Sequence, residues 1–251
     1  MVMAGEWAED RTVLRISGSD AEGFLQGLVT NDLAKPKSRL VYSALLTPQG
    51  KYLFDFFLLA EGGGFLLDVK TDRAAALAQR LTMYRLRADV QIEEAGLVVN
   101  RGLSEAPDGS FTDPRNAALG WRHYTAVQGE GSQIDWAAIR VAHLIPETGV
   151  ELLPDSSYIL EAGFEALSGV DFRKGCYVGQ EVTARMKHKT ELRKGLRVVS
   201  VDGAATIGTE IKVNDKIVGS LFTQSGGQGI AYLRLDRVRD GMTAGDAQIA
   251  L

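Results

Sequence analysis

The only thiol of the chain lies in a short motif whose neighbours could make it reactive. Cys176 stands between Gly175 and Gly179 and follows Arg173 and Lys174. Glycine allows positive φ and lets a ligand come close to backbone N–H groups. Adjacent cations favour the thiolate, the nucleophilic form of cysteine. A buried, inert cysteine in a tight turn explains the same residues equally well, because free cysteine is among the most buried residue types.

Aromatic side chains close to arginines form a second candidate for chemistry. Trp136 lies four residues before Arg140, and Tyr84 directly precedes an arginine. Aromatic rings stack on flat heterocycles, and arginine pairs with carboxylates, so these residues could hold a flat anionic ligand. A place in the core is the alternative for each ring. Asp55 interrupts the apolar run 52–59, where an acid must be paired, lie at an edge or be functional.

Several common catalytic signatures are missing from the sequence. There is no P-loop, no dinucleotide-binding glycine pattern after a strand and no G-x-S-x-G element. His123, His143 and His188 are scattered without metal-ligand spacing. One cysteine cannot form an internal disulfide framework or hold an iron–sulfur cluster alone. We therefore expect no resident metal.

Composition and charge narrow the class of protein. The 251 residues are 45% apolar, with 28 basic and 32 acidic side chains. Residues 173–197 contain eight basic and two acidic side chains, so this segment carries +6 against −10 for the remainder. Such a local patch suggests a specific anionic ligand or partner rather than general nucleic-acid binding, although a solvated basic segment is the alternative. The acidic N-terminus and the absence of a long apolar run predict a cytosolic protein without a membrane span.

The order of expected elements favours an α+β fold. A capping box from Ser19 to Glu22 begins a first helix, and Thr71 caps a second helix. Apolar runs joined by hairpin-length turns predict an antiparallel meander. The expected strands span residues 12–17, 40–47, 52–61, 65–70 and 90–94.

The C-terminal residues have a different character. Asp135 caps a short helix over residues 136–142, and after residue 194 short β-runs alternate with turn pairs. Asn214-Asp215 is typical of a two-residue hairpin turn. We predict an α+β domain over residues 1–194 and a small β-barrel domain over residues 195–251.

Several motifs resemble those of one family. Residues 174–181, KGCYVGQE, resemble the K-G-C-[FY]-x-G-Q-E signature of the YgfZ family, folate-binding relatives of the glycine cleavage T-protein, an aminomethyltransferase. The segments FLQGLVTND (24–32), LTPQGK (46–51), and DPR with GWR between 113 and 122 resemble further family motifs in the same order. Leu144-Ile145 stands where the family has Gly-Ile.

The resemblance implies a fold and a function. It implies two ferredoxin-like halves in a T-protein-like body, a C-terminal β-barrel and bound tetrahydrofolate. It also implies a role in assembling or repairing iron–sulfur clusters, including those of radical enzymes that modify tRNA. The expected partners are iron–sulfur client or assembly proteins, with no direct contact to nucleic acid or membrane.

The resemblance also implies roles for single residues. Lys174 and Cys176 match the functional pair of the motif, with Lys174 favouring the thiolate. The residues expected near the folate are Trp136, Asp55, Tyr84, Arg140, Tyr177 and Glu181. Two other functions stay open: a folate-dependent one-carbon transferase in which Asp55 assists attack, and a binding module that docks an acidic protein on its basic segment.

Overall fold

The computed structural model describes residues 5–34, 39–188 and 192–251, so Lys189 of the basic segment lies outside the described residues. The chain divides into two compact units. The first unit comprises Met1–Gln49, Leu53–Ile134 and Glu165–Gln180. The second comprises Gly50–Tyr52, Asp135–Phe164 and Glu181–Leu251. The domain division after residue 194 stays a prediction.

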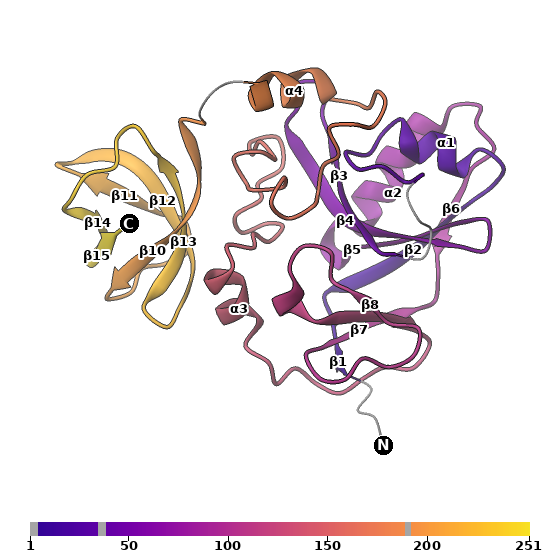
Figure 1. Cartoon of the computed structure of the whole chain (residues 1–251), viewed down its shortest axis with the longest axis horizontal. Coiled ribbons are helices and arrows are strands. Elements are labelled where there is room, and N and C mark those ends of the chain that lie inside the picture. The colour runs from indigo at the N-terminus through magenta and orange to yellow at the C-terminus, as the bar shows by residue number, and fades with distance from the viewer. Residues whose placement is uncertain (1–4, 35–38, 189–191) are drawn as a thin grey trace. The chain divides into compact units, whose positions relative to one another are not determined.

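The first unit is built on a large antiparallel sheet with strand order β3-β4-β5-β2-β6 (Figure 1). The expected meander is confirmed, because β3, β4 and β5 are neighbours and β4 pairs antiparallel with β5. β4 and β5 are buried almost throughout, as their continuous apolar sequences require. The strands are β2 (Arg11–Ser17), β3 (Val41–Leu46), β4 (Tyr52–Glu61), β5 (Gly64–Lys70) and β6 (Gln91–Glu94).

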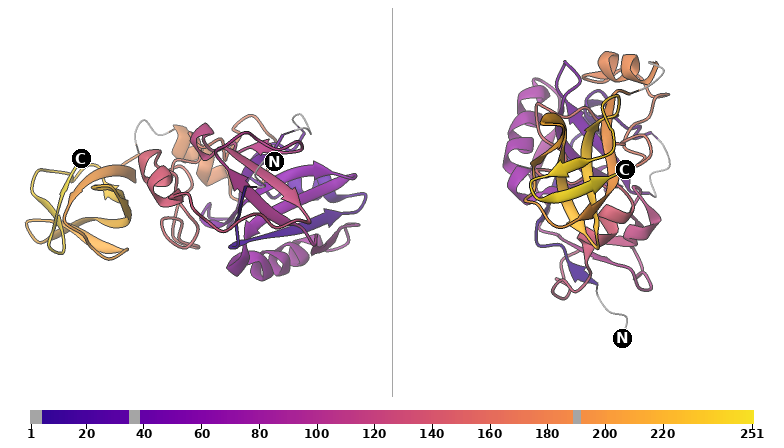
Figure 2. Two further views of the ribbon diagram at one scale, coloured as in Figure 1. Left: turned by 90° about the horizontal axis from the view of Figure 1, so that it is seen from below. Right: turned by 90° about the vertical axis from the view of Figure 1, so that its left-hand side faces the viewer.

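Two helices accompany this sheet, α1 (Ala21–Gln26) and α2 (Thr71–Arg85). α2 lies along one face of the sheet (Figure 2) and buries Leu77 and Leu81 there. The capping box predicted at Ser19 is wrong: the cap position of α1 is Asp20, and the Ser19 hydroxyl donates to Asp89 at 2.9 Å instead. Ser19 therefore bonds to a residue 70 positions away in the chain and not to the first turn of the helix, as the local pattern had predicted.

A smaller sheet completes the first unit, with strand order β1-β7-β9-β8. Its strands are β1 (Glu6–Trp7), β7 (Val98–Gly102), β8 (Phe111–Thr112) and β9 (Trp121–Thr125), and a 3₁₀ turn spans Ala117–Leu119. Gly102 is required where Trp121 crosses it, because a Cβ there would lie 2.6 Å from the indole ring. The smaller sheet carries β8, which forms part of the site described below.

A buried ion pair joins the two sheets. Asp68 on β5 accepts hydrogen bonds from Arg11 on β2 (2.6 Å) and from Arg122 (2.6 and 3.1 Å) and Tyr124 (3.0 Å) on β9. Burial alone would raise the pKa of Asp68, but the two guanidinium groups outweigh it and hold that pKa below its usual value. The carboxylate therefore stays charged and fixes β9 against the large sheet.

The second unit contains a helix, α3 (Trp136–Ala142), and a closed barrel with strand order β10-β13-β12-β11-β14-β15 (Figure 2). Asp135 caps α3 as predicted, accepting from the Ala138 N–H at 2.9 Å. Asn214 and Asp215 form the predicted turn, both with positive φ. The barrel strands are β10 (Lys194–Asp202), β11 (Thr209–Val213), β12 (Lys216–Ser225), β13 (Gln228–Arg234), β14 (Met242–Ala244) and β15 (Ala247–Ala250).

The α+β class and the C-terminal barrel are thus confirmed. A fourth helix, α4 (Gln180–His188), begins at the last residue of the first unit. Within the described residues, no helix has the length and apolar character needed to cross a membrane.

Candidate functional site

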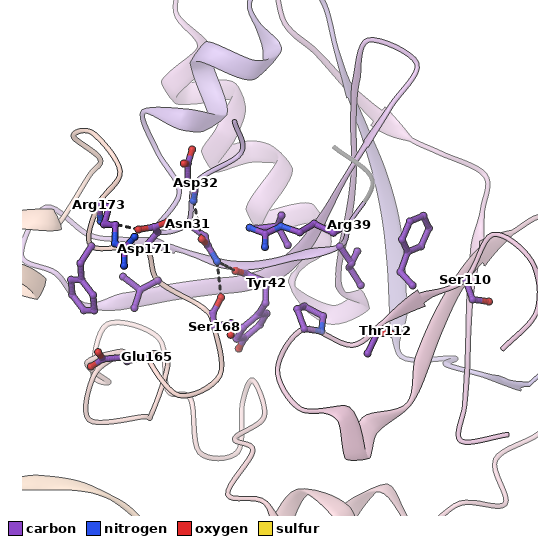
Figure 3. A pocket seen from close by; sticks show the side chains of 16 residues that line it. Asn31, Asp32, Arg39, Tyr42, Ser110, Thr112, Glu165, Ser168, Asp171 and Arg173 are labelled. Atoms are coloured by element: carbon purple, nitrogen blue, oxygen red, sulfur yellow. Dashed lines mark hydrogen bonds between the residues drawn. The ribbon is translucent and has the colours of Figure 1, made fainter. Parts of the chain in front are cut away.

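A pocket of about 1100 Å³ lies within the first unit (Figure 3). Three stretches of chain form it: the loop after α1 with the start of β3, residues 110–114 around the strand β8, and residues 165–173. These stretches are far apart in sequence, so the folding of the unit creates the pocket. Its polar lining side chains are Asn31, Asp32, Arg39, Tyr42, Ser110, Thr112, Glu165, Ser168, Asp171 and Arg173.

One wall of the pocket is held by internal hydrogen bonds. The buried Asn31 amide donates to the carbonyls of Tyr42 (2.9 Å) and Ser168 (2.6 Å), as Figure 3 shows. Asp171 accepts from the Arg173 N–H at 2.8 Å. Ser168 has a φ of 55°, a conformation that costs a non-glycine residue energy unless its surroundings fix it. This wall is therefore preorganised.

The chemistry of the lining suits an anionic ligand that carries a ring. Arg39 and Arg173 offer guanidinium groups, which pair with carboxylates or phosphates. Tyr42, Phe111 and Phe172 contribute aromatic surface. Three acids of the lining, Asp32, Glu165 and Asp171, could accept hydrogen bonds from ring N–H groups.

Lys174 lies directly behind this wall. It is 7% exposed, and its ammonium donates to the carbonyls of Gln26 (2.7 Å), Val29 (2.5 Å) and Asn31 (3.2 Å). Burial lowers the pKa of Lys174 to about 8, which the nearby Asp32 partly opposes. Lys174 thus ties its own loop to the segment that carries Asn31.

The remaining residues of the cysteine motif differ in exposure. Cys176 is a free, exposed cysteine, so the buried alternative is wrong. Tyr177 is buried, and its ring centroid lies 5.1 Å from the Lys174 ammonium. Glu181 is exposed in the first turn of α4, in the second unit. The structure therefore brings Lys174 and Tyr177 together.

Asp55 lies behind another part of the pocket. It is buried on β4 and accepts a hydrogen bond at 3.0 Å from the hydroxyl of Tyr42, which lines the pocket. Tyr84, by contrast, lies on α2 and packs against the hydrophobic core of the first unit.

Trp136 and Arg140 belong to α3 in the second unit. The Arg140 guanidinium lies 3.1 Å from Glu147 and 3.2 Å from the buried Glu151, and it donates to the Thr223 hydroxyl on β12 at 3.1 Å. In this structure Arg140 thus holds α3 and the following loop to the barrel.

The departure from the family pattern at Leu144 has a clear geometry. Leu144 has a φ of 52° directly after α3, and the Ile145 N–H donates to the Arg140 carbonyl at 2.9 Å. This is a helix-ending turn that normally uses glycine at the left-handed position. In this chain Leu144 occupies that left-handed position.

All eight site residues predicted from sequence are described, and none of them lines the pocket. Asp55 and Lys174 each contact a lining residue, Tyr42 and Asn31. The lining residues themselves were missed as site residues. A signal did exist, because Asn31-Asp32 ends the segment FLQGLVTND and Pro114 lies in the DPR segment, both of which resemble family motifs.

Comparison with known proteins gives three kinds of match. Residues 193–251 match the family model of the CAF17 C-terminal β-barrel domain. The chain is 31% identical to the human mitochondrial iron–sulfur cluster assembly factor IBA57, covering 97% of this chain and 82% of the relative. For the mouse protein of that name the identity is 31%, with 92% and 77% covered.

A solved structure has the same fold. The glycine cleavage system aminomethyltransferase T from Bartonella henselae superposes with a TM-score of 0.73 at 15% identity, over 96% of this chain and 82% of that one. The predicted T-protein-like α+β fold followed by a β-barrel is therefore confirmed.

These matches correct one expectation and refine another. The prediction of a cytosolic protein is contradicted, because the human, mouse and Neurospora crassa relatives are all named as mitochondrial. The first residues of a chain were too little evidence for its compartment. The relatives carry the name IBA57 rather than YgfZ. Since the human match exceeds 30% identity over most of both chains, this chain belongs to the IBA57 family of iron–sulfur cluster assembly factors.

Proposed function

We propose that this protein assembles or repairs iron–sulfur clusters, binds tetrahydrofolate in its pocket and uses Cys176 as its functional thiol. One observation carries the proposal: an exposed thiol lies three residues after Arg173, which lines a pocket suited to a ring-bearing anion. The human and mouse relatives are named as cluster assembly factors, which supports the role in assembly.

Tetrahydrofolate fits the chemistry of the lining. Its glutamate carboxylates would pair with Arg39 and Arg173, and its rings would contact Tyr42, Phe111 or Phe172. A volume of about 1100 Å³ is ample for a molecule of this size. Trp136, in the second unit, stays a predicted stacking residue.

The thiol would handle a cluster only together with another molecule. One thiolate cannot hold an iron–sulfur cluster, so a partner chain, a second copy or glutathione must supply further ligands. The clients would be iron–sulfur enzymes, including radical enzymes that modify tRNA.

Folate binding is tested by anaerobic calorimetric titration with tetrahydrofolate. We expect saturable binding near one per chain, weakened in Arg39→Ala and Arg173→Ala. Arg87→Ala is the matched control, because Arg87 is exposed and does not line the pocket. If both pocket variants bind tetrahydrofolate with wild-type affinity and Trp136→Ala loses binding, the folate site is not in this pocket. No binding to the wild type would refute the folate part of the proposal.

The role of the thiol is tested in cells that lack their own IBA57-type factor. We expect this chain to restore cluster-dependent enzyme activity, and Cys176→Ala to fold and bind folate without restoring it. Full rescue by Cys176→Ala would remove the thiol from the function. Methylthiolation of tRNA, measured in the same cells, shows whether the tRNA-modifying enzymes are among the clients.

A one-carbon transferase is the second candidate. The buried Asp55 carboxylate, hydrogen-bonded to the pocket residue Tyr42, favours it. Such an enzyme would turn over an aminomethyl donor with tetrahydrofolate and lose this turnover in Asp55→Asn. Folate binding without turnover of any donor would exclude it.

A further inference from the structure

We infer that Lys174 is a positioning residue that couples ligand binding in the pocket to the reactivity of Cys176. The inference rests on the proposed function, since it takes tetrahydrofolate as the pocket ligand. The ligand would then regulate the thiol, because Cys176 would react at different rates when the pocket is occupied and when it is empty.

The loop from Asp171 to Tyr177 contains both pocket-lining residues and the thiol. Its first residues, Asp171, Phe172 and Arg173, line the pocket, and the thiol follows three residues after Arg173. Phe172, Arg173 and Cys176 are exposed, whereas Lys174 between them is buried. The loop is thus held at three buried residues, Asp171, Lys174 and Tyr177, and exposes residues between them.

Lys174 fixes this loop to the segment 26–31, which belongs to the same wall of the pocket. Its three carbonyl acceptors, Gln26, Val29 and Asn31, lie more than 140 residues earlier in the chain. Asn31 itself lines the pocket. The Asp171 N–H adds a further tie by donating to the Thr30 carbonyl at 3.0 Å. A ligand that binds Arg173 or Asn31 can therefore change the position of the loop that carries Cys176.

The same geometry argues against direct activation of the thiol by Lys174. An ammonium group has three protons to donate, and three carbonyls accept them here. No proton of Lys174 is left for a hydrogen bond to the sulfur. Lys174 acts on Cys176 through the position of the loop, and Arg173 is the exposed cation of the motif.

Alkylation of Cys176 measures the coupling. The thiolate displaces iodide from iodoacetamide to form a thioether, and the proton of the thiol passes to the buffer. Saturating tetrahydrofolate should slow this reaction about fivefold, a modest coupling between two sites. We expect two causes for the slowing. The carboxylates of the ligand neutralise the positive charge of Arg173, and this charge is what favours the thiolate. The bound ligand also holds the loop in one position.

Lys174→Met should weaken the slowing by tetrahydrofolate, because the contribution of the loop is lost and only the neutralisation of Arg173 remains, while calorimetry still records binding. Lys216→Met is the matched control, because Lys216 is exposed on the barrel, and it should keep the wild-type response. A role of Lys174 in folding alone would lower stability but leave the response to ligand intact, and would overturn the inference.

A measurement on the wild type covers the case in which Lys174→Met does not fold. Hydrogen exchange of residues 26–31 and 171–177 should slow together on adding tetrahydrofolate. Binding in the calorimeter without change in alkylation or in exchange of these segments would overturn the inference and leave the proposed function standing. No binding in the calorimeter would remove both.

Discussion

The charge of Asp68 should contribute several kcal/mol to the free energy of unfolding of the first unit, and Asp68→Asn tests this. The side chain is 1% exposed and receives hydrogen bonds from Arg11, Arg122 and Tyr124. Asparagine keeps the size of the side chain but replaces one acceptor oxygen with a donor and removes the charge. The substitution therefore tests the charge and the hydrogen bonds of Asp68 with little change in packing.

The magnitude follows from the contacts. One oxygen of Asp68 accepts from Arg11, and the other accepts from Arg122 twice and from Tyr124 once. Whichever position the amide nitrogen takes, it faces a guanidinium donor. At least one charge-assisted hydrogen bond is lost, Arg11 loses its carboxylate partner, and Arg122 keeps only Asp113, at 3.6 Å. Breaking a buried pair in this way costs about 3–5 kcal/mol.

Urea unfolding followed by tryptophan fluorescence measures the loss, and a thermal scan should show a decrease in Tm of about 6–20 °C. Asp108→Asn is the control, because Asp108 is exposed in a loop of the same unit, and it should change stability by less than about 0.5 kcal/mol. A loss below about 1 kcal/mol in Asp68→Asn would refute the reasoning.

The pH dependence gives an independent check. Since the pKa of Asp68 lies below its usual value of 3.8, its contribution is complete at neutral pH and is lost as the pH falls through the lowered pKa. The stability difference between wild type and Asp68→Asn should therefore persist to about pH 4 and shrink in stronger acid. In Asp68→Asn/Arg122→Met the losses should be less than additive, because the second change removes one of the two cations that face the Asp68 carboxylate.

Three further predictions concern other parts of the chain. Glu151→Gln should lower the stability of the second unit by about 2–3 kcal/mol, measured by thermal unfolding, because the buried carboxylate loses its charge beside Arg140. Asp215→Gly should raise barrel stability by about 1 kcal/mol in urea, since Asn214-Gly suits a turn in which both residues have positive φ; a decrease would contradict this. The pKa of Lys174, lowered to about 8, means that the unfolded chain binds more protons above that pH, so stability should rise from pH 8 to about 9.5 in wild type and not in Lys174→Met.

Sequence alone determined the features whose partners are near in the chain. Asp135 caps a helix through a residue three positions on, and Asn214-Asp215 turns a hairpin between adjacent strands. The strand predicted over residues 52–61 is β4, with the same bounds. Backbone geometry and apolar pattern over a few residues are sufficient for such features, because the interacting groups belong to one short segment.

The tertiary structure decided where the chemically active side chains lie. Lys174 beside Cys176 in sequence suggests a cation for a thiolate, yet its ammonium donates to Val29, 145 residues away. Tyr84, beside arginines, packs against the core, and Arg39 and Arg173 line one pocket only when the unit folds. A single sequence records which groups can donate or accept, but the donors and acceptors that meet are chosen by long-range packing. For this reason the T-protein-like fold could be recognised from the sequence, whereas the IBA57 family and the pocket could not.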